Sequence, residues 1–300
     1  MENALGCRSL LLVCLLTSLL NCSGSEENLD NFEKPEINDN SVVGSDVNAQ
    51  EYWSKTKLVW SDEFNGSDLS AENWIVESSQ AGIGYAGWQN FTGEGNLDVS
   101  DGTLKIISKK TGVGQKQGDY TSARINSTVA FTYGKLEVRA KLLGGNGNGS
   151  GLWSKLFLLG NNIGAVDYPK CGQISLMEYT SHIPDKVFNT VHNAENVLTG
   201  QKVAANSGYI SLETAEEEFH LFGVLWTDEY LKFYIDDIEN IVYSFSRPSS
   251  PNENNWPFSN SFYFVLDTSV GGEFSDGKGV EDSVLPSTFE IDYVRVYHAQ

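Results

Sequence analysis

The sequence predicts an all-β protein, a sandwich or β-jelly roll of two antiparallel sheets. Three observations predict this fold: short apolar or alternating runs follow one another from residue 57 onward, turn residues separate them, and no long helical stretch intervenes. The turn signals recur at the interval of about 8–12 residues that is typical of sandwiches. A domain of roughly 240 residues can hold one large core and leave one sheet face free to be concave.

The first 22 residues are typical of a signal peptide. Arg8 precedes an apolar run from Leu10 to Leu20, which suits a signal sequence and is short for a membrane span. The run ends in Leu-Leu-Asn-Cys, which resembles a bacterial lipoprotein signal with Cys22 as the acylated residue, although Asn21 stands where a small residue is usual. We therefore expect a membrane-anchored lipoprotein of the bacterial outer membrane or cell surface, with a secreted protein as the alternative.

Residues 23–55 are polar and acidic, and we expect them to form a flexible tether. They show almost no apolar periodicity and offer little surface to bury. The folded domain is accordingly expected at residues 56–300. If Cys22 carries lipid, Cys171 is the one cysteine left in the mature chain, so no intrachain disulfide is expected.

Within the domain, strands are expected where apolar residues run together or alternate. The clearest cases are residues 104–107, 135–141, 231–235 and 262–266. Turn residues lie between such runs at Asp101-Gly102, residues 144–147 and Asp236-Asp237.

The composition narrows the choice of partner. Asp and Glu number 40 against 20 Lys and Arg, giving a formal net charge of −20, and a surface this acidic repels a phosphate backbone. Nucleic acid is therefore excluded and a neutral ligand is favoured. The aromatic content of 12% suits a surface that stacks on sugars. No His/Cys cluster indicates zinc. We also expect the protein to be a monomer.

Eight stretches in the same order resemble glycoside hydrolase family 16, in particular its laminarinase-like (endo-β-1,3-glucanase) members. They span residues 57–297 and include residues 57–66, 120–125, 133–141, 190–192 and 290–297. The resemblance implies a β-jelly roll with a carbohydrate cleft on its concave face and a polysaccharide, β-glucan, as partner.

The resemblance also locates the catalytic strand, but two of its three carboxylates are missing. The family pattern G-E-I-D-x-M-E corresponds here to Gly-Gln-Ile-Ser-Leu-Met-Glu at residues 172–178. Gln173 stands at the nucleophile position, Ser175 at the middle Asp position, and Glu178 is retained at the acid/base position. An amide is too poor a nucleophile to form the glycosyl ester of a retaining mechanism.

The alternation of this strand breaks before Glu178. A period of two would send Glu178 to the face opposite Gln173 and Ser175. We predict a one-residue bulge near Leu176 and Met177 that returns Glu178 to the cleft face. Two neighbouring anions would raise the pKa of Glu178 and keep it protonated near neutral pH. Without them, Glu178 is expected to be a poorer general acid.

Two further segments depart from the family. The pattern G-W-G-N-N-E aligns with residues 82–87, where Tyr85, Ala86 and Gly87 replace its polar groups. The pattern W-P-A-F-W-M-L-G aligns with residues 153–160, Trp-Ser-Lys-Leu-Phe-Leu-Leu-Gly, so that Phe157 replaces the second tryptophan. Changes in three separate cleft segments indicate that catalysis is lost.

Binding groups are more widely retained. Gln173 can still hydrogen-bond a sugar hydroxyl, and aromatic rings can stack on pyranose faces. The aromatic candidates, with Trp153 and Tyr168 foremost, are Trp88, Trp153, Phe157, Tyr168, Trp226 and Trp256. Arg124 and His192 also match family cleft positions. The alternatives are core packing for any of the rings, a surface ion pair for Arg124 and a structural role for His192.

The resemblance further implies a structural calcium ion held by Glu63, the carbonyl of Gly102 and Asp292, whose oxygen ligands suit Ca²⁺. The function expected first is a β-glucan-binding homologue without catalysis. The alternatives are an active endo-acting hydrolase that uses Glu178, and a protein-interaction module that no longer binds sugar, which Lys155 and the lost Asn/Glu groups favour.

Overall fold

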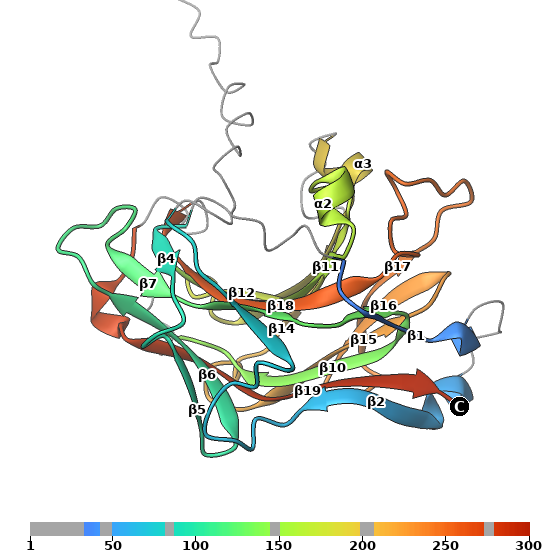
Figure 1. Cartoon of the computed structure of the whole chain (residues 1–300), viewed down its shortest axis with the longest axis horizontal. Coiled ribbons are helices and arrows are strands. Elements are labelled where there is room, and N and C mark those ends of the chain that lie inside the picture. Colours follow the sequence, from blue (N-terminus) through green and yellow to red (C-terminus); the bar gives the residue numbers. More distant parts are fainter. Residues whose placement is uncertain (1–32, 43–49, 82–86, 145–150, 199–206, 273–278) are drawn as a thin grey trace, which may run out of the picture.

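The computed structural model describes residues 33–42, 50–81, 87–144, 151–198, 207–272 and 279–300. They form two stacked β-sheets (Figure 1). The predicted signal peptide with Cys22, the first part of the predicted tether, and Tyr85 and Ala86 lie outside these ranges. Among the helices of the described ranges, none is long and apolar enough to cross a membrane.

The first sheet carries the candidate site and is called the site sheet. It has nine strands in the order β1-β9-β18-β11-β12-β13-β14, and β8 joins β3 to β18. The strands are β1 (Glu36–Asn38), β3 (Trp74–Glu77), β8 (Arg124–Ser127), β9 (Ala130–Thr132), β11 (Leu152–Gly160), β12 (Gln173–Thr180), β13 (Lys186–His192), β14 (Ser207–Ser211) and β18 (Phe262–Val270).

The second sheet has ten strands in the order β17-β16-β15-β10-β19-β6-β7-β4, with β2 on β19 and β5 on β6. The strands are β2 (Thr56–Asp62), β4 (Gln89–Phe91), β5 (Leu97–Ser100), β6 (Thr103–Lys110), β7 (Tyr120–Ser122), β10 (Gly134–Lys141), β15 (His220–Trp226), β16 (Tyr230–Ile235), β17 (Ile241–Ser246) and β19 (Ser287–Ala299). Short helical segments are η1 (Asn40–Val42), η2 (Gln50–Ser54), α2 (Ile163–Val166), α3 (Ala194–Leu198) and η5 (Asp282–Val284).

The all-β sandwich prediction is confirmed, with one difference in strand direction. The pairs β1·β9 and β4·β7 are parallel, so the sheets are mixed rather than purely antiparallel. The members of each pair are not consecutive in the chain, so no tight hairpin constrains them to be antiparallel.

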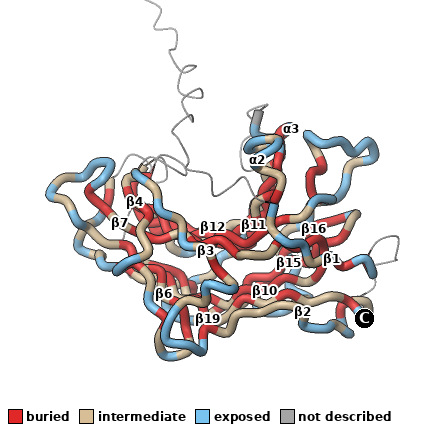
Figure 2. The backbone as a smooth tube through the Cα atoms, viewed as in Figure 1, coloured by how far each residue is buried: buried red, intermediate tan, exposed pale blue. Residues whose placement is uncertain are grey.

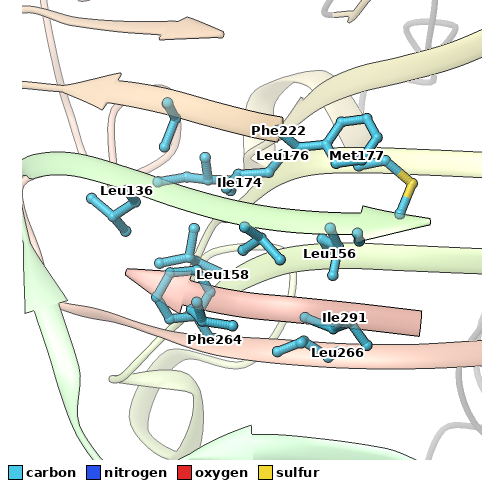
Figure 3. Close-up of a cluster of buried hydrophobic side chains, with 14 of the residues drawn as sticks. Leu136, Leu156, Leu158, Ile174, Leu176, Met177, Phe222, Phe264, Leu266 and Ile291 are labelled. Carbon is cyan, nitrogen blue, oxygen red and sulfur yellow. The ribbon is translucent and has the colours of Figure 1, made fainter. Parts of the chain in front are cut away.

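The hydrophobic core lies between the two sheets. Figure 3 shows side chains of the site sheet meeting side chains of β10, β15 and β19; they include Leu156, Leu158, Ile174, Leu266, Leu136, Phe222 and Ile291. Burying each such side chain stabilises the fold by about 1.5–3 kcal/mol. Figure 2 shows the buried backbone running through the middle of both layers. Because Leu156 and Leu158 fill the core, the residues that alternate with them along β11, such as Lys155 and Phe157, face away from it, on what we call the outer face of the site sheet.

The second half of the expected tether packs on the domain, which differs from the sequence-based expectation. β1 pairs with β9, and the Ala130 amide donates to the Pro35 carbonyl at 2.8 Å. Val42 is fully buried, and Trp53 is buried with its Nε1 donating to the Tyr230 hydroxyl at 3.2 Å. A few apolar residues within a polar stretch are enough to dock it, so the packed structure begins before residue 56.

Candidate functional site

The candidate site is built around a bulge in β12. On the β11 side, Leu156 lies opposite Met177 and Phe157 opposite Ser175, which leaves Leu176 as the extra residue. On the β13 side the register shifts by one residue between Ser175 and Glu178. This confirms the predicted bulge. It lets neighbouring Leu176 and Met177 both enter the core, where they are fully buried, and returns Glu178 to the outer face.

The three residues at the catalytic positions therefore share one face. Gln173 and Ser175 are buried, and the Gln173 Nε2 donates to the Ser175 Oγ at 2.8 Å. His192 lies opposite Gln173 on β13, and its Nε2 is 3.7 Å from the Glu178 Oε1. The position expected for a nucleophile thus holds a neutral amide whose side chain is already hydrogen-bonded.

The neighbours of Glu178 act on its pKa in opposite directions. Burial raises its pKa, but the nearby His192 ring, the Ser175 hydroxyl and the charge of Lys155 together outweigh this effect. The pKa of Glu178 consequently lies below its usual value, which agrees with the prediction of a poorer acid.

A row of alternating charges crosses the outer face, and we call it the charge row. Cross-strand partners bring together Glu77 of β3, Arg124 of β8, Asp267 of β18, Lys155 of β11 and Glu178 of β12. The Arg124 Nε donates to Asp267 at 2.8 Å, and its Nη1 is 3.6 Å from Glu77. The Lys155 Nζ is 3.5 Å from the other oxygen of Asp267. Each charge thus lies next to opposite charges, which offsets the cost of burying it.

Lys155 is the most unusual member of the charge row because it is fully buried. Burial and the charge of Arg124 lower its pKa, whereas Asp267 and Glu178 oppose this effect, and the net result is a pKa below the usual lysine value. The pKa of Arg124 lies above its usual value, since Asp267 and Glu77 together outweigh the effect of burial. Arg124 is therefore a half-buried cation paired with two acids.

Two aromatic candidates flank Lys155 on β11. Its Nζ lies 4.2 Å from the ring centroid of Trp153 and 5.4 Å from that of Phe157. These rings are only 3% and 5% exposed. Phe157 also belongs to a small apolar cluster on this face with Ala130, Tyr263 and Val265. The structure thus brings the predicted rings to the site but buries them beside a cation.

The other aromatic candidates divide into two groups. Tyr168 is 40% exposed, and its ring centroid is 6.4 Å from that of His192, beside the catalytic-type strand. Trp88 is half-buried and stacks on Tyr120. Trp226 and Trp256 are buried in the core cluster. For these two, the expectation of a sugar platform is wrong, because core packing takes up their ring faces.

The carboxylates expected to bind calcium have arginine partners. Glu63 accepts from the Arg295 Nε and Nη2 at 2.9 and 2.7 Å, and Asp292 pairs with Arg139. In the described ranges no group of three or more His, Cys, Asp or Glu side chains could hold a metal ion. As placed, these residues do not fit a calcium ion unless it displaces Arg295, and the calcium site stays a prediction.

Sequence reasoning missed Asp267, Glu77 and the partnership of both with Arg124. A signal was present for Asp267, since an acid in the apolar run from Phe262 to Val270 calls for a buried cation. No comparable signal marks Glu77, which lies in a short strand near the surface.

Comparisons with known proteins agree on one family. The family model for Glycosyl hydrolases family 16 matches residues 85–293. A beta-glucanase of Rhodothermus marinus is 33% identical over 270 residues, covering 86% of this chain and 90% of that protein. The crystal structure of a laminarinase from Flavobacterium sp. UMI-01 is 34% identical with a TM-score of 0.71, covering 81% of this chain and all of the other. The laminarinase of Rhodothermus marinus gives 30% identity and a TM-score of 0.73, covering 82% and 98%.

Proposed function

Because the chain belongs to glycosyl hydrolase family 16, we propose that it binds β-glucan, of the laminarin-like β-1,3 type, without cleaving it. The observation that carries this proposal is Gln173. It occupies the nucleophile position on the outer face of β12, and its amide is held by Ser175. An amide can bind a sugar hydroxyl but does not form a glycosyl ester.

The general-acid step, which protonates the leaving oxygen, is impaired as well. A retaining mechanism needs an acid that protonates the leaving oxygen. Glu178, with its lowered pKa, is ionised at neutral pH and has no proton to give. Both steps of the first half-reaction therefore lack their catalytic group.

A neutral polysaccharide fits the electrostatics of the face. The charge row is internally paired, so it offers no unbalanced cation to an anionic polymer, and the chain as a whole carries a formal charge of −20. His192 contributes a partly exposed imidazole, and Tyr168 contributes an exposed ring.

The alternative is an active endo-acting hydrolase that uses Glu178. The observation that favours it is the relatedness to proteins named glucanase and laminarinase. The two functions differ in their products, because only the hydrolase releases new reducing ends.

One experiment separates them. The full chain is incubated with laminarin, mixed-linkage β-glucan and a galactan, and affinity and reducing ends are measured in the same samples. The matched control is Glu178→Gln, which keeps the side-chain shape and removes the charge. We expect saturable binding of β-glucan and no more reducing ends than the control gives. Product well above the control would favour the hydrolase, and failure to bind any glycan would leave the interaction module.

We also propose that a lipid on Cys22 anchors the protein to the bacterial outer membrane or cell surface, and that it acts there as a monomer. The Leu-Leu-Asn-Cys motif after the apolar run supports the anchor. Surface exposure would place a polymer-binding face where it can meet glucan.

A further inference from the structure

We propose that the glycan stacks on an aromatic platform formed by Phe188 of β13 and Tyr209 of β14, at the far edge of the site sheet. We call this pair the edge platform. The inference rests on the proposed function and names the binding site within it. It moves the main stacking contact away from Trp153 and Tyr168, the rings that the sequence favours.

The strand register places the edge platform on the outer face. Glu178 lies opposite Phe188, and Phe188 lies opposite Tyr209. Directly opposed residues in antiparallel strands share one face, so the edge platform continues the line of the charge row beyond Glu178. A polymer lying across the strands along this line would pass from the catalytic-type strand onto the two rings.

The backbone of β14 fixes the direction in which Tyr209 points. Its neighbour Gly208 packs so closely against Tyr243 of β17 that an added Cβ would come within 2.5 Å of the Tyr243 Cβ. This face of β14 is therefore closed by β17, and Tyr209, one residue on, points to the opposite side. Ile210 packs against the core beside the same contact.

The edge platform has an accessible aromatic surface, which the buried rings of Trp153 and Phe157 on β11 lack. Tyr209 is 60% exposed, whereas Trp153 is 3% exposed and lies against the Lys155 ammonium. Stacking on a pyranose requires an open ring face. The Tyr209 and Phe188 ring centroids are 5.8 Å apart, and the Lys186 Nζ is 5.1 Å from the Tyr209 centroid. These two contacts hold the Tyr209 ring in place.

The surroundings indicate the class of ligand. Ser207 and Ser211 lie two residues before and after Tyr209 on the same face of β14, and Lys186 lies opposite Ser211. Hydroxyl groups and one ammonium donor around a pair of rings suit a neutral sugar whose hydroxyls radiate from an apolar C–H face. β-Linked glucose units, with their hydroxyls equatorial, have such a face.

The test measures laminarin affinity by calorimetry on the full chain. Tyr209→Ala is expected to weaken binding by about tenfold, the loss of one aromatic contact of ~1.4 kcal/mol. Tyr209→Phe keeps the ring and should stay within about twofold of wild type. Leu58→Ala removes another exposed apolar side chain, 46% exposed, from β2 of the other sheet and should leave the affinity unchanged. Unchanged thermal unfolding temperatures will show that each variant folds.

Two results would overturn the proposal. Wild-type affinity in Tyr209→Ala would show that the ring is not used. A larger loss in Tyr168→Ala than in Tyr209→Ala would place the sugar over the catalytic-type strand instead. In both cases the wild type still binds laminarin, so the proposed function stands and only its location changes. If the wild type binds no glycan, the proposed function fails and the edge platform fails with it.

Discussion

Replacing Lys155 by methionine should destabilise the protein by about 1–3 kcal/mol, because it leaves a buried carboxylate with one cation instead of two. Lys155 and Asp267 are both fully buried, and their charged atoms are 3.5 Å apart. At an effective dielectric constant of about 20, a pair at this distance attracts by roughly 5 kcal/mol.

Three effects reduce this attraction to the smaller net figure. Burying the ammonium costs several kcal/mol, which the variant recovers. Arg124 repels Lys155, yet it stays hydrogen-bonded to Asp267 at 2.8 Å when the lysine is gone. Methionine fills most of the vacated volume and makes favourable contacts with Trp153 and Phe157 through its sulfur.

The assay is urea unfolding of Lys155→Met, Asp267→Asn and the double variant. If the two charges stabilise each other, the free energy of unfolding should fall less in the double variant than the two single-variant decreases added together. The difference should be at least about 1 kcal/mol. Lys141→Met is the matched control, because its ion pair with Glu290 at 2.8 Å is partly exposed and should contribute about 0–1 kcal/mol. Additivity of the Lys155 and Asp267 effects to within about 0.5 kcal/mol would refute the interpretation of the charge row.

Four further outcomes are expected. The pKa of Glu178 is lower in the folded state than in the unfolded state. The ionised carboxylate therefore stabilises the fold above the unfolded pKa, and this stabilisation is lost as the pH falls through the folded pKa. The free energy of unfolding should consequently drop more steeply below about pH 4.5 in wild type than in Glu178→Gln. Gln173→Glu alone should release no reducing ends from laminarin, because Ser175 still replaces one of the two carboxylates that would raise the pKa of Glu178, and product from this single variant would contradict that reasoning. Adding calcium to EDTA-treated protein should shift the unfolding temperature by less than about 1 °C, since Arg295 holds Glu63; a larger rise that Glu63→Gln abolishes would establish the calcium site. Radiolabelled palmitate should label the wild type expressed in a Gram-negative host but not Cys22→Ser, and equal labelling would exclude that anchor.

The bulge in β12 could be predicted from the sequence, because its signal is local. An interrupted alternation between Ser175 and Glu178 has few structural solutions, and a one-residue bulge is the simplest. The family resemblance supplied the reason for it, and the strand register confirmed it.

The charge row could not be predicted in the same way. Its members come from β3, β8, β11, β12 and β18, and which residues lie opposite each other depends on the register of five strands at once. A shift of one residue in any pair would have sent a charge to the core. Trp153 and Lys155, two residues apart on β11, share one face by the local period of two, but the sequence does not show that the ammonium packs over the ring.

The burial of Trp226 and Trp256 shows a limit of composition arguments. Both are aromatic residues close to turns, like Tyr168, but they lie among apolar neighbours that close over them. Tyr209, which no motif marked, is the more exposed ring because it lies on an edge strand.

The site sheet also separates the place where the chain enters the domain from the place where the glycan is proposed to bind. β1, the first strand after the N-terminal segment, lies at one edge of the strand order, and β14 with Tyr209 lies at the other. Six steps between neighbouring strands at about 4.8 Å make this separation roughly 29 Å along the sheet. A lipid on the N-terminal segment would thus attach on the side of the β1 edge, with the edge platform at the opposite edge of the sheet.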